Sequence, residues 1–189
     1  MEITLTDKEK LILLRTARES IASHLEGRPG DYPETTETLQ TVCGAFVTLH
    51  REGDLRGCIG NISGTKPLIE GIRELAVSSA FRDPRFPPLR RDELEQTDIE
   101  ISVLTPLEKA SSPNEVVVGK HGIMMRSGSR SGVLLPQVPI EQGWNREQFL
   151  DHTCRKAGLP AGCWKEEQTE IFLFSALVFG ENDYREESR

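Results

Sequence analysis

A cysteine flanked by an arginine and two glycines lies in the stretch Leu55-Arg56-Gly57-Cys58-Ile59-Gly60. Alternate side chains of a β-strand share a face, so the pattern places Arg56 beside Cys58. A guanidinium next to a thiol favours the thiolate, which is the nucleophilic form of cysteine. Glycine inside a strand marks a bulge or the close approach of a ligand or another backbone, which makes Gly57 and Gly60 candidate binding positions. The alternative is a buried, inert cysteine whose glycine neighbours only allow the strand to bend.

A second candidate segment covers residues 82–88 and contains three prolines, which exclude a regular helix or strand. Prolines lower the entropy that a loop loses on folding, so this loop can hold Asp83 and Arg85 in fixed positions. We expect both side chains in the same cleft as Arg56 and Cys58, where Arg85 would clamp an anionic group with its planar guanidinium. The alternative is a rigid connector in which Asp83 and Arg85 pair only with each other on the surface.

His50 ends the strand that precedes the Cys58 strand. In a regular hairpin, a loop of two or four residues places His50 and Cys58 on opposite faces, and a loop of three residues places them on the same face. A histidine at a strand end before a polar turn is usually only solvated, so His50 is not among the predicted site residues.

Composition and charge limit the classes of function. The chain has 189 residues and a net charge of −7, enough length for one substantial core or two small subdomains. The negative charge argues against general nucleic-acid binding, which needs a basic face for phosphates. The longest strongly apolar run, residues 171–179, is far too short to cross a membrane. The amino terminus shows no signal-peptide pattern, so we expect a cytoplasmic protein.

The four cysteines show neither CxxC spacing nor the clustering of a zinc site. This pattern predicts free thiols in a reducing compartment, without a metal or another cofactor. Cys43 is expected in the core, and Cys154 and Cys163 are interpreted as packing residues.

The order of predicted elements repeats along the chain. A capping box at Thr6–Glu9 starts a helix that should stop at Gly27. In the first half we expect strands 41–50 and 55–62, helix 67–81 and strand 98–104; in the second, strands 116–118, 122–126 and 132–135, helix 145–157 and strand 169–179. Hairpin, helix and strand therefore occur twice, over 41–104 and 116–179. The prediction is an α+β fold in which both repeats contribute to one curved, mixed or antiparallel sheet, with the helices packed outside.

Six short motifs resemble those of the AMMECR family. They are Leu55-Arg56-Gly57-Cys58-Ile59-Gly60, Asp83-Pro84-Arg85-Phe86-Pro87-Pro88, His121-Gly122, Leu134-Leu135-Pro136-Gln137, Gly143-Trp144 and Lys156-Ala157-Gly158. The resemblance covers residues 5–180 as one domain and leaves 181–189 as a polar tail. It implies a barrel-like sheet with a cleft between two subdomains. Bacterial members are called AmmeMemoRadiSam system protein A, and the family often occurs beside or fused to a Memo-type, dioxygenase-like protein and a radical-SAM protein, which are the expected partners.

The resemblance also extends the candidate site. Arg56, Cys58 and Gly60 match the strand motif, His121 matches a histidine before the second hairpin, and Gln137 would orient a substrate amide or carboxylate. One hypothesis is an enzyme that uses the Cys58 thiolate with His121 as acid and base, in a metal-free cleft, on a small-molecule or protein substrate. The other is a non-catalytic module that binds a ligand or docks onto the Memo-like and radical-SAM partners. A metal held by Cys58 and His121 lacks further ligands at motif spacing.

Overall fold

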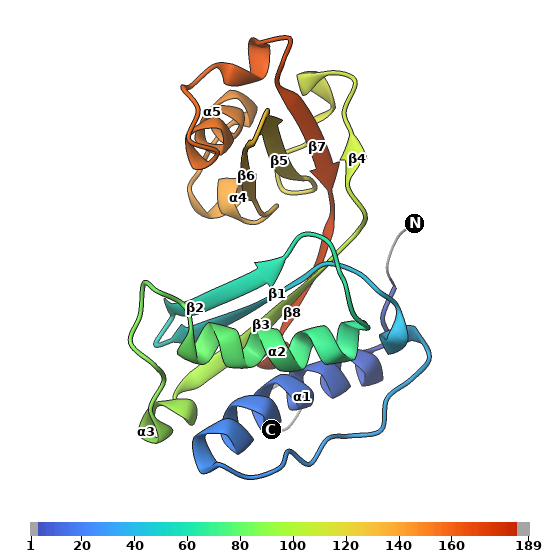
Figure 1. Ribbon diagram of the computed structural model, residues 1–189, viewed down its shortest axis with the longest axis vertical. Helices are drawn as coiled ribbons and strands as arrows, with labels where there is room; N and C mark the ends of the chain where they lie inside the picture. The colour runs from blue at the N-terminus through green and yellow to red at the C-terminus, as the bar shows by residue number, and fades with distance from the viewer. Residues whose placement is uncertain (1–3, 185–189) are drawn as a thin grey trace. The chain divides into compact units, whose positions relative to one another are not determined.

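The computed structural model describes residues 4–184, which belong to two compact units (Figure 1). Unit 1 comprises the segments before Thr105 and after Ala176, and unit 2 is the continuous segment Thr105–Ala176. Unit 2 is therefore inserted into the chain of unit 1.

Unit 1 is a four-stranded sheet with two long helices on one face (Figure 1). The strand order is β2-β1-β3-β8, and β1 pairs antiparallel with both β2 and β3. The elements are α1 (Asp7–Glu26), a 3-10 turn (Thr38–Gln40), β1 (Ala45–Arg51), β2 (Asp54–Asn61), α2 (Leu68–Phe81), α3 (Arg91–Leu94), β3 (Thr97–Leu104), β8 (Ala176–Gly180) and a 3-10 turn (Glu181–Tyr184).

The helix ends and the core of unit 1 follow the sequence closely. The Thr6 side chain accepts a hydrogen bond from the Glu9 N–H, and the Glu9 carboxylate accepts from the Thr6 N–H at 2.9 Å, which confirms the predicted capping box. Gly27 ends α1 with a φ of +64°, a conformation in which glycine has no steric penalty. The apolar faces of α1 and α2 bury alternate residues of the sheet, among them Val47, Leu49, Ile99, Ile101 and Val103.

The β1–β2 hairpin contains a bulge that decides which way Cys58 points. Its turn has positive φ at both central residues, Glu52 and Gly53, as a two-residue type I′ turn requires. Leu49 then pairs with Gly57 but His50 pairs with Leu55, so Arg56 is the extra residue of a β-bulge. Without the bulge, a two-residue turn would set Cys58 opposite a core residue of β1.

Unit 2 is a second four-stranded sheet, in the order β4-β7-β5-β6, with α5 packed against it. Its core contains the fully buried Ile123, Met125 and Phe149. The elements are β4 (Glu108–Lys109), a 3-10 turn (Pro113–Glu115), β5 (Gly122–Ser127), β6 (Arg130–Leu134), α4 (Val138–Glu141), α5 (Arg146–Lys156), a 3-10 turn (Cys163–Lys165) and β7 (Glu170–Phe174).

The α+β class is confirmed, but the single barrel-like sheet is wrong. Across residues 4–184 the strands form two separate antiparallel sheets, and neither closes into a barrel. The predicted strand 169–179 breaks at Ser175, whose N–H donates to Thr105 Oγ1 at 2.8 Å and whose carbonyl accepts from the Thr105 N–H at 2.9 Å. The part before the break, β7, joins the sheet of unit 2, and the part after it, β8, joins the sheet of unit 1. No strand forms at residues 116–118. The predicted cleft between subdomains stays a prediction.

The prediction of four free thiols is also wrong, because Cys154 and Cys163 form a disulfide. Cys154 lies near the end of α5, and the turn that follows brings Cys163 back against it, a contact that the spacing of nine residues does not reveal. Cys43 and Cys58 are free.

The predicted tail starts as part of unit 1. The Glu181 carboxylate accepts hydrogen bonds from the Arg18 guanidinium and from the Ile99 N–H. Residues 185–189 lie outside the described part of the chain. None of the helices within 4–184 combines the length and apolar character needed to cross a membrane.

Candidate functional site

A polar group of side chains surrounds Cys58 on the sheet face opposite the helices of unit 1. Thr48 of β1 pairs with Cys58 on one side and with Glu100 of β3 on the other, so the three residues form a row across the sheet. The Thr48 hydroxyl donates a hydrogen bond to Cys58 Sγ at 3.3 Å. We call Thr48, Cys58, Glu100 and the adjoining Asp83 and Arg85 the Cys58 patch.

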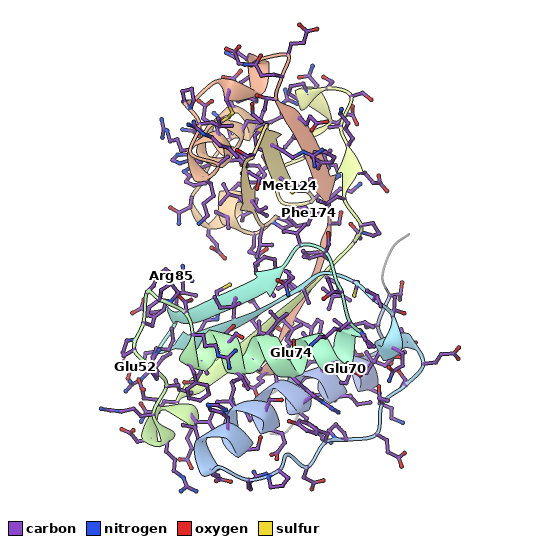
Figure 2. All side chains as sticks on the ribbon, viewed as in Figure 1. Glu52, Glu70, Glu74, Arg85, Met124 and Phe174 are labelled. Carbon is purple, nitrogen blue, oxygen red and sulfur yellow. A yellow bond between two sulfur atoms is a disulfide. The ribbon has the colours of Figure 1, made fainter. Side chains whose placement is uncertain are left out.

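Asp83 and Arg85 hold the backbone of Cys58 at the open edge of the sheet. The Asp83 carboxylate is 4% exposed and accepts hydrogen bonds from the Cys58 N–H at 2.9 Å and from Arg85 Nε and Nη2 at 3.0 and 2.7 Å. Arg85 Nη2 also donates to the Cys58 carbonyl at 3.4 Å. The two side chains thus bond the same backbone groups that a neighbouring strand would bond, and Arg85 lies beside the edge strand β2 (Figure 2).

Asp83 and Arg85 pair with each other, as in the alternative interpretation, but the pair also bonds the Cys58 backbone and so is not a free surface pair; the predicted cleft shared with Arg56 stays a prediction. The hydrogen bonds from Arg85 hold the pKa of Asp83 well below its usual value, and the Cys58 N–H acts in the same direction. Asp83 is therefore ionised at neutral pH, and its charge fixes the Arg85 guanidinium next to Cys58.

The Cys58 thiol is neutral at pH 7. Burial raises its pKa above the usual value of 9.0, and the nearby Asp83 and Glu100 carboxylates act in the same direction. The hydrogen bond from Thr48 and the positive charge of Arg85 lower the pKa of the thiol but do not outweigh burial.

Arg56 does not activate Cys58, so the predicted thiolate-promoting role of Arg56 is wrong. Its buried guanidinium donates to the Glu93 carboxylate at 3.3 and 3.2 Å and to the Pro87 carbonyl at 2.9 Å. Glu93 also accepts from Arg51 Nη1 at 2.9 Å, and these charges help to lower the pKa of Glu93 to about 2. As the bulge residue, Arg56 leaves the regular alternation of the strand, and the arginine whose charge acts on the thiol is Arg85.

The two glycines beside Cys58 make room for atoms of the chain itself. A Cβ at Gly57 would lie 2.2 Å from the Ser79 carbonyl oxygen of α2, and one at Gly60 would lie 2.2 Å from the Phe46 ring. Packing within unit 1 therefore requires glycine at both positions, and their predicted ligand-binding role stays a prediction.

His121 and Gln137 belong to unit 2, so the predicted pairing of Cys58 with His121 stays a prediction. The His121 Nδ1 atom lies 3.3 Å from the Val117 backbone nitrogen and 3.1 Å from the Glu115 carbonyl oxygen. The Gln137 carbonyl accepts from the Ile140 and Glu141 N–H groups in the first turn of α4.

Sequence reasoning missed Thr48 and Glu100 and set His50 aside. Because β1 pairs regularly with β3, His50 lies on the same sheet face as Thr48 and therefore as Cys58. A cavity of about 190 Å³ opens on unit 1 between His50, Asp98, Glu100, Gly180 and Asp183, among other residues. Gly57 is the signal in the sequence for a bulge or a close approach, but it does not show that Arg56 is the extra residue, which is what brings His50 and Cys58 to one face. Among residues 4–184 no three His, Cys, Asp or Glu side chains are grouped so as to hold a metal ion.

Comparison with known proteins gives a consistent family assignment. The AMMECR1 family model matches residues 14–179. Protein MK0488 of Methanopyrus kandleri is 46% identical over 95% of this chain and 91% of its own length. A protein of Methanothermobacter thermautotrophicus is 42% identical over 94% of this chain and 97% of its own. The crystal structure of PH0010 from Pyrococcus horikoshii matches with a TM-score of 0.88 and 41% identity, over 94% of this chain and 93% of the other. None of these names states an activity.

Proposed function

Since this chain belongs to the AMMECR1 family, whose name carries no reaction, we propose from the geometry that it is a ligand-recognition module and that the Cys58 patch is its site. The observation that carries the proposal is the Asp83 carboxylate, which is buried and bonded to both Cys58 and Arg85. It fixes a guanidinium whose side chain is 53% exposed beside a neutral thiol. A guanidinium held in this way is ready to bind without further loss of side-chain entropy.

The ligand is expected to carry an anionic group. Asp83 accepts from Nε and Nη2 of Arg85, whose side chain is still about half exposed. The remaining N–H groups would receive a carboxylate or a phosphate. The thiol and hydroxyl of Cys58 and Thr48 would contact the rest of the ligand, which would extend toward the cavity beside His50.

Nuclear magnetic resonance titration tests this proposal with acetate and inorganic phosphate as probes. We expect saturable shifts of the Cys58 amide and the Arg85 Nε–H, and their loss in Arg85→Gln. Arg90→Gln is the matched control, because Arg90 is 70% exposed and pairs with the exposed Asp92. Absence of saturable shifts, or equal binding by Arg85→Gln, would contradict the proposal.

A cysteine-dependent enzyme is the second candidate, and one observation favours it. The Thr48 hydrogen bond to Sγ and the Arg85 charge both act in the direction that an activated thiol requires, against the larger effect of burial, which raises the pKa of Cys58. In this form of the proposal Cys58 attacks a small-molecule or protein substrate and His121 acts as acid and base. The rate of iodoacetamide labelling at pH 7 separates the two candidates: faster than a cysteine-containing peptide for the enzyme, slower for the module.

The family resemblance adds two further proposals. The module would dock onto a Memo-like or a radical-SAM protein, and it would do so in the cytoplasm. Co-purification with each partner, compared between the native protein and Arg85→Gln, tests the docking. Equal recovery from both would show that docking does not use the Cys58 patch.

A further inference from the structure

The end of α2 contacts β2 immediately after Cys58. Ser79, one of the last residues of α2, is 1% exposed. Its hydroxyl donates to the Val47 carbonyl at 2.7 Å and accepts from the Ile59 N–H at 2.9 Å. Val47 and Ile59 are direct partners in the β1–β2 register, so one helix hydroxyl bridges both strands of the hairpin.

The same helix end also contacts β2 immediately before Cys58. The Ser79 carbonyl oxygen would lie only 2.2 Å from a Cβ at Gly57, so the helix and strand backbones touch there. Asp83, two residues beyond the end of α2, accepts a hydrogen bond from the Cys58 N–H. Of three consecutive strand residues, Gly57 is in contact with the Ser79 carbonyl, Cys58 donates to the Asp83 carboxylate, and Ile59 donates to the Ser79 hydroxyl.

We infer that Ser79 is a positioning residue for the Cys58 thiol. A serine inside a helix commonly donates its hydroxyl to the carbonyl four residues earlier, but the Ser79 hydroxyl donates to the sheet. Without the hydroxyl, the Val47 carbonyl and the Ile59 N–H lose the buried group that links both of them to α2, and we expect the hairpin to shift relative to the end of the helix. Such a shift would move Cys58 away from Asp83. The inference assumes that the Cys58 patch is the functional site, but its test needs no ligand.

The test compares Ser79→Ala with Ser78→Ala, its half-buried neighbour on α2. Iodoacetamide labelling of Cys58 is followed by mass spectrometry from pH 6 to 10, with Cys43 as an internal reference. In Ser79→Ala we expect Cys58 to react about threefold faster at pH 8, with the midpoint of its pH profile shifted to lower pH, because a displaced strand exposes the thiol and burial is the largest effect that disfavours its thiolate. Cys43 and the Ser78→Ala control should keep their native profiles.

A folded Ser79→Ala protein with a native or slower Cys58 profile would overturn the inference. If that variant does not fold, amide hydrogen exchange of the native protein tests the inference. Protection of the Cys58 and Ile59 amides comparable to the central strand β1 supports the inference, and exchange at the rate of an exposed loop overturns it. The loss of acetate or phosphate binding in Arg85→Gln tests the proposed function separately. The proposed function and the positioning role of Ser79 can therefore fail independently.

Discussion

Replacing Glu93 by Gln should cost about 3 kcal/mol of unfolding free energy, although the new residue has nearly the same shape. Glu93 is 7% exposed, and its pKa falls from 4.5 to about 2 in the folded protein. A shift of about 2.5 pKa units corresponds to roughly 3 kcal/mol at 1.36 kcal/mol per unit. Removing one partner of a buried ion pair has a cost of about 3–5 kcal/mol, because the Arg56 guanidinium remains buried with its charge uncompensated.

Equilibrium unfolding in urea at pH 7 measures this loss, with Asp92→Asn as the control. Asp92 is a neighbouring acidic residue whose side chain is 69% exposed, and its ion pair with Arg90 is an exposed one. Exposed pairs contribute at most about 1 kcal/mol, so the control should stay close to the native stability. The Gln side chain keeps one oxygen for the Arg90 N–H, but its NH2 group replaces the other acceptor, so the measured loss combines the charge and the hydrogen bonds that this oxygen accepts.

A loss below about 1 kcal/mol in Glu93→Gln, or a loss equal to that of the control, would refute the reasoning. It would mean that the ion pair between Arg56 and Glu93 contributes little to stability. The charge of Arg56 would then again be available to the Cys58 thiol.

Three further predictions concern the acid transition, the reactivity of Cys58 and the disulfide. The free energy of unfolding should fall as the pH drops from about 4.5 toward 2. The Glu93 carboxylate stabilises the fold at pH values above 4.5, its pKa in the unfolded chain, and protonation near its folded pKa of about 2 removes this stabilisation. The Glu93→Gln variant should lack this part of the acid transition when urea unfolding is measured at different pH values. Arg85→Gln should slow iodoacetamide labelling of Cys58 roughly threefold, whereas Arg56→Gln should leave the rate unchanged and lower the stability instead; the opposite pattern would contradict the assignment of charges. The unfolded, unreduced protein should react with Ellman's reagent at two thiols and the reduced protein at four; four reactive thiols without reduction would contradict the disulfide. Reduction should lower the free energy of unfolding by about 3 kcal/mol, because the disulfide closes a loop with a sequence separation of 9.

Local signals in the sequence predict the elements well, because short-range chemistry determines them. The Thr6–Glu9 capping box, the stop at Gly27 and the proline-bounded start of α2 each depend on residues within one helical turn. The pairing of Asp83 with Arg85 was predictable for the same reason, since they are two residues apart in a loop stiffened by proline.

The arrangement of the site was not predictable, because it depends on contacts distant in sequence. The bulge at Arg56 coincides with the close approach of Ser79 to Gly57; the glycine indicates that something comes close, but neither the partner nor the register follows from the strand itself. A shift of one residue reverses every side chain of a strand, so this single feature moved Cys58 to the polar face. The break at Ser175 likewise depends on a partner, Thr105, that lies 70 residues away.

The insertion of unit 2 has a consequence for synthesis on the ribosome. β3 ends at Leu104 and its sheet neighbour β8 begins at Ala176, so the whole of unit 2 emerges before unit 1 has its last strand. Phe179, which is buried in the core of unit 1, arrives only then. A chain that ended at residue 176 would carry a complete second unit and a first unit whose β3 edge and core are still open, a state that is prone to aggregation and to binding by chaperones.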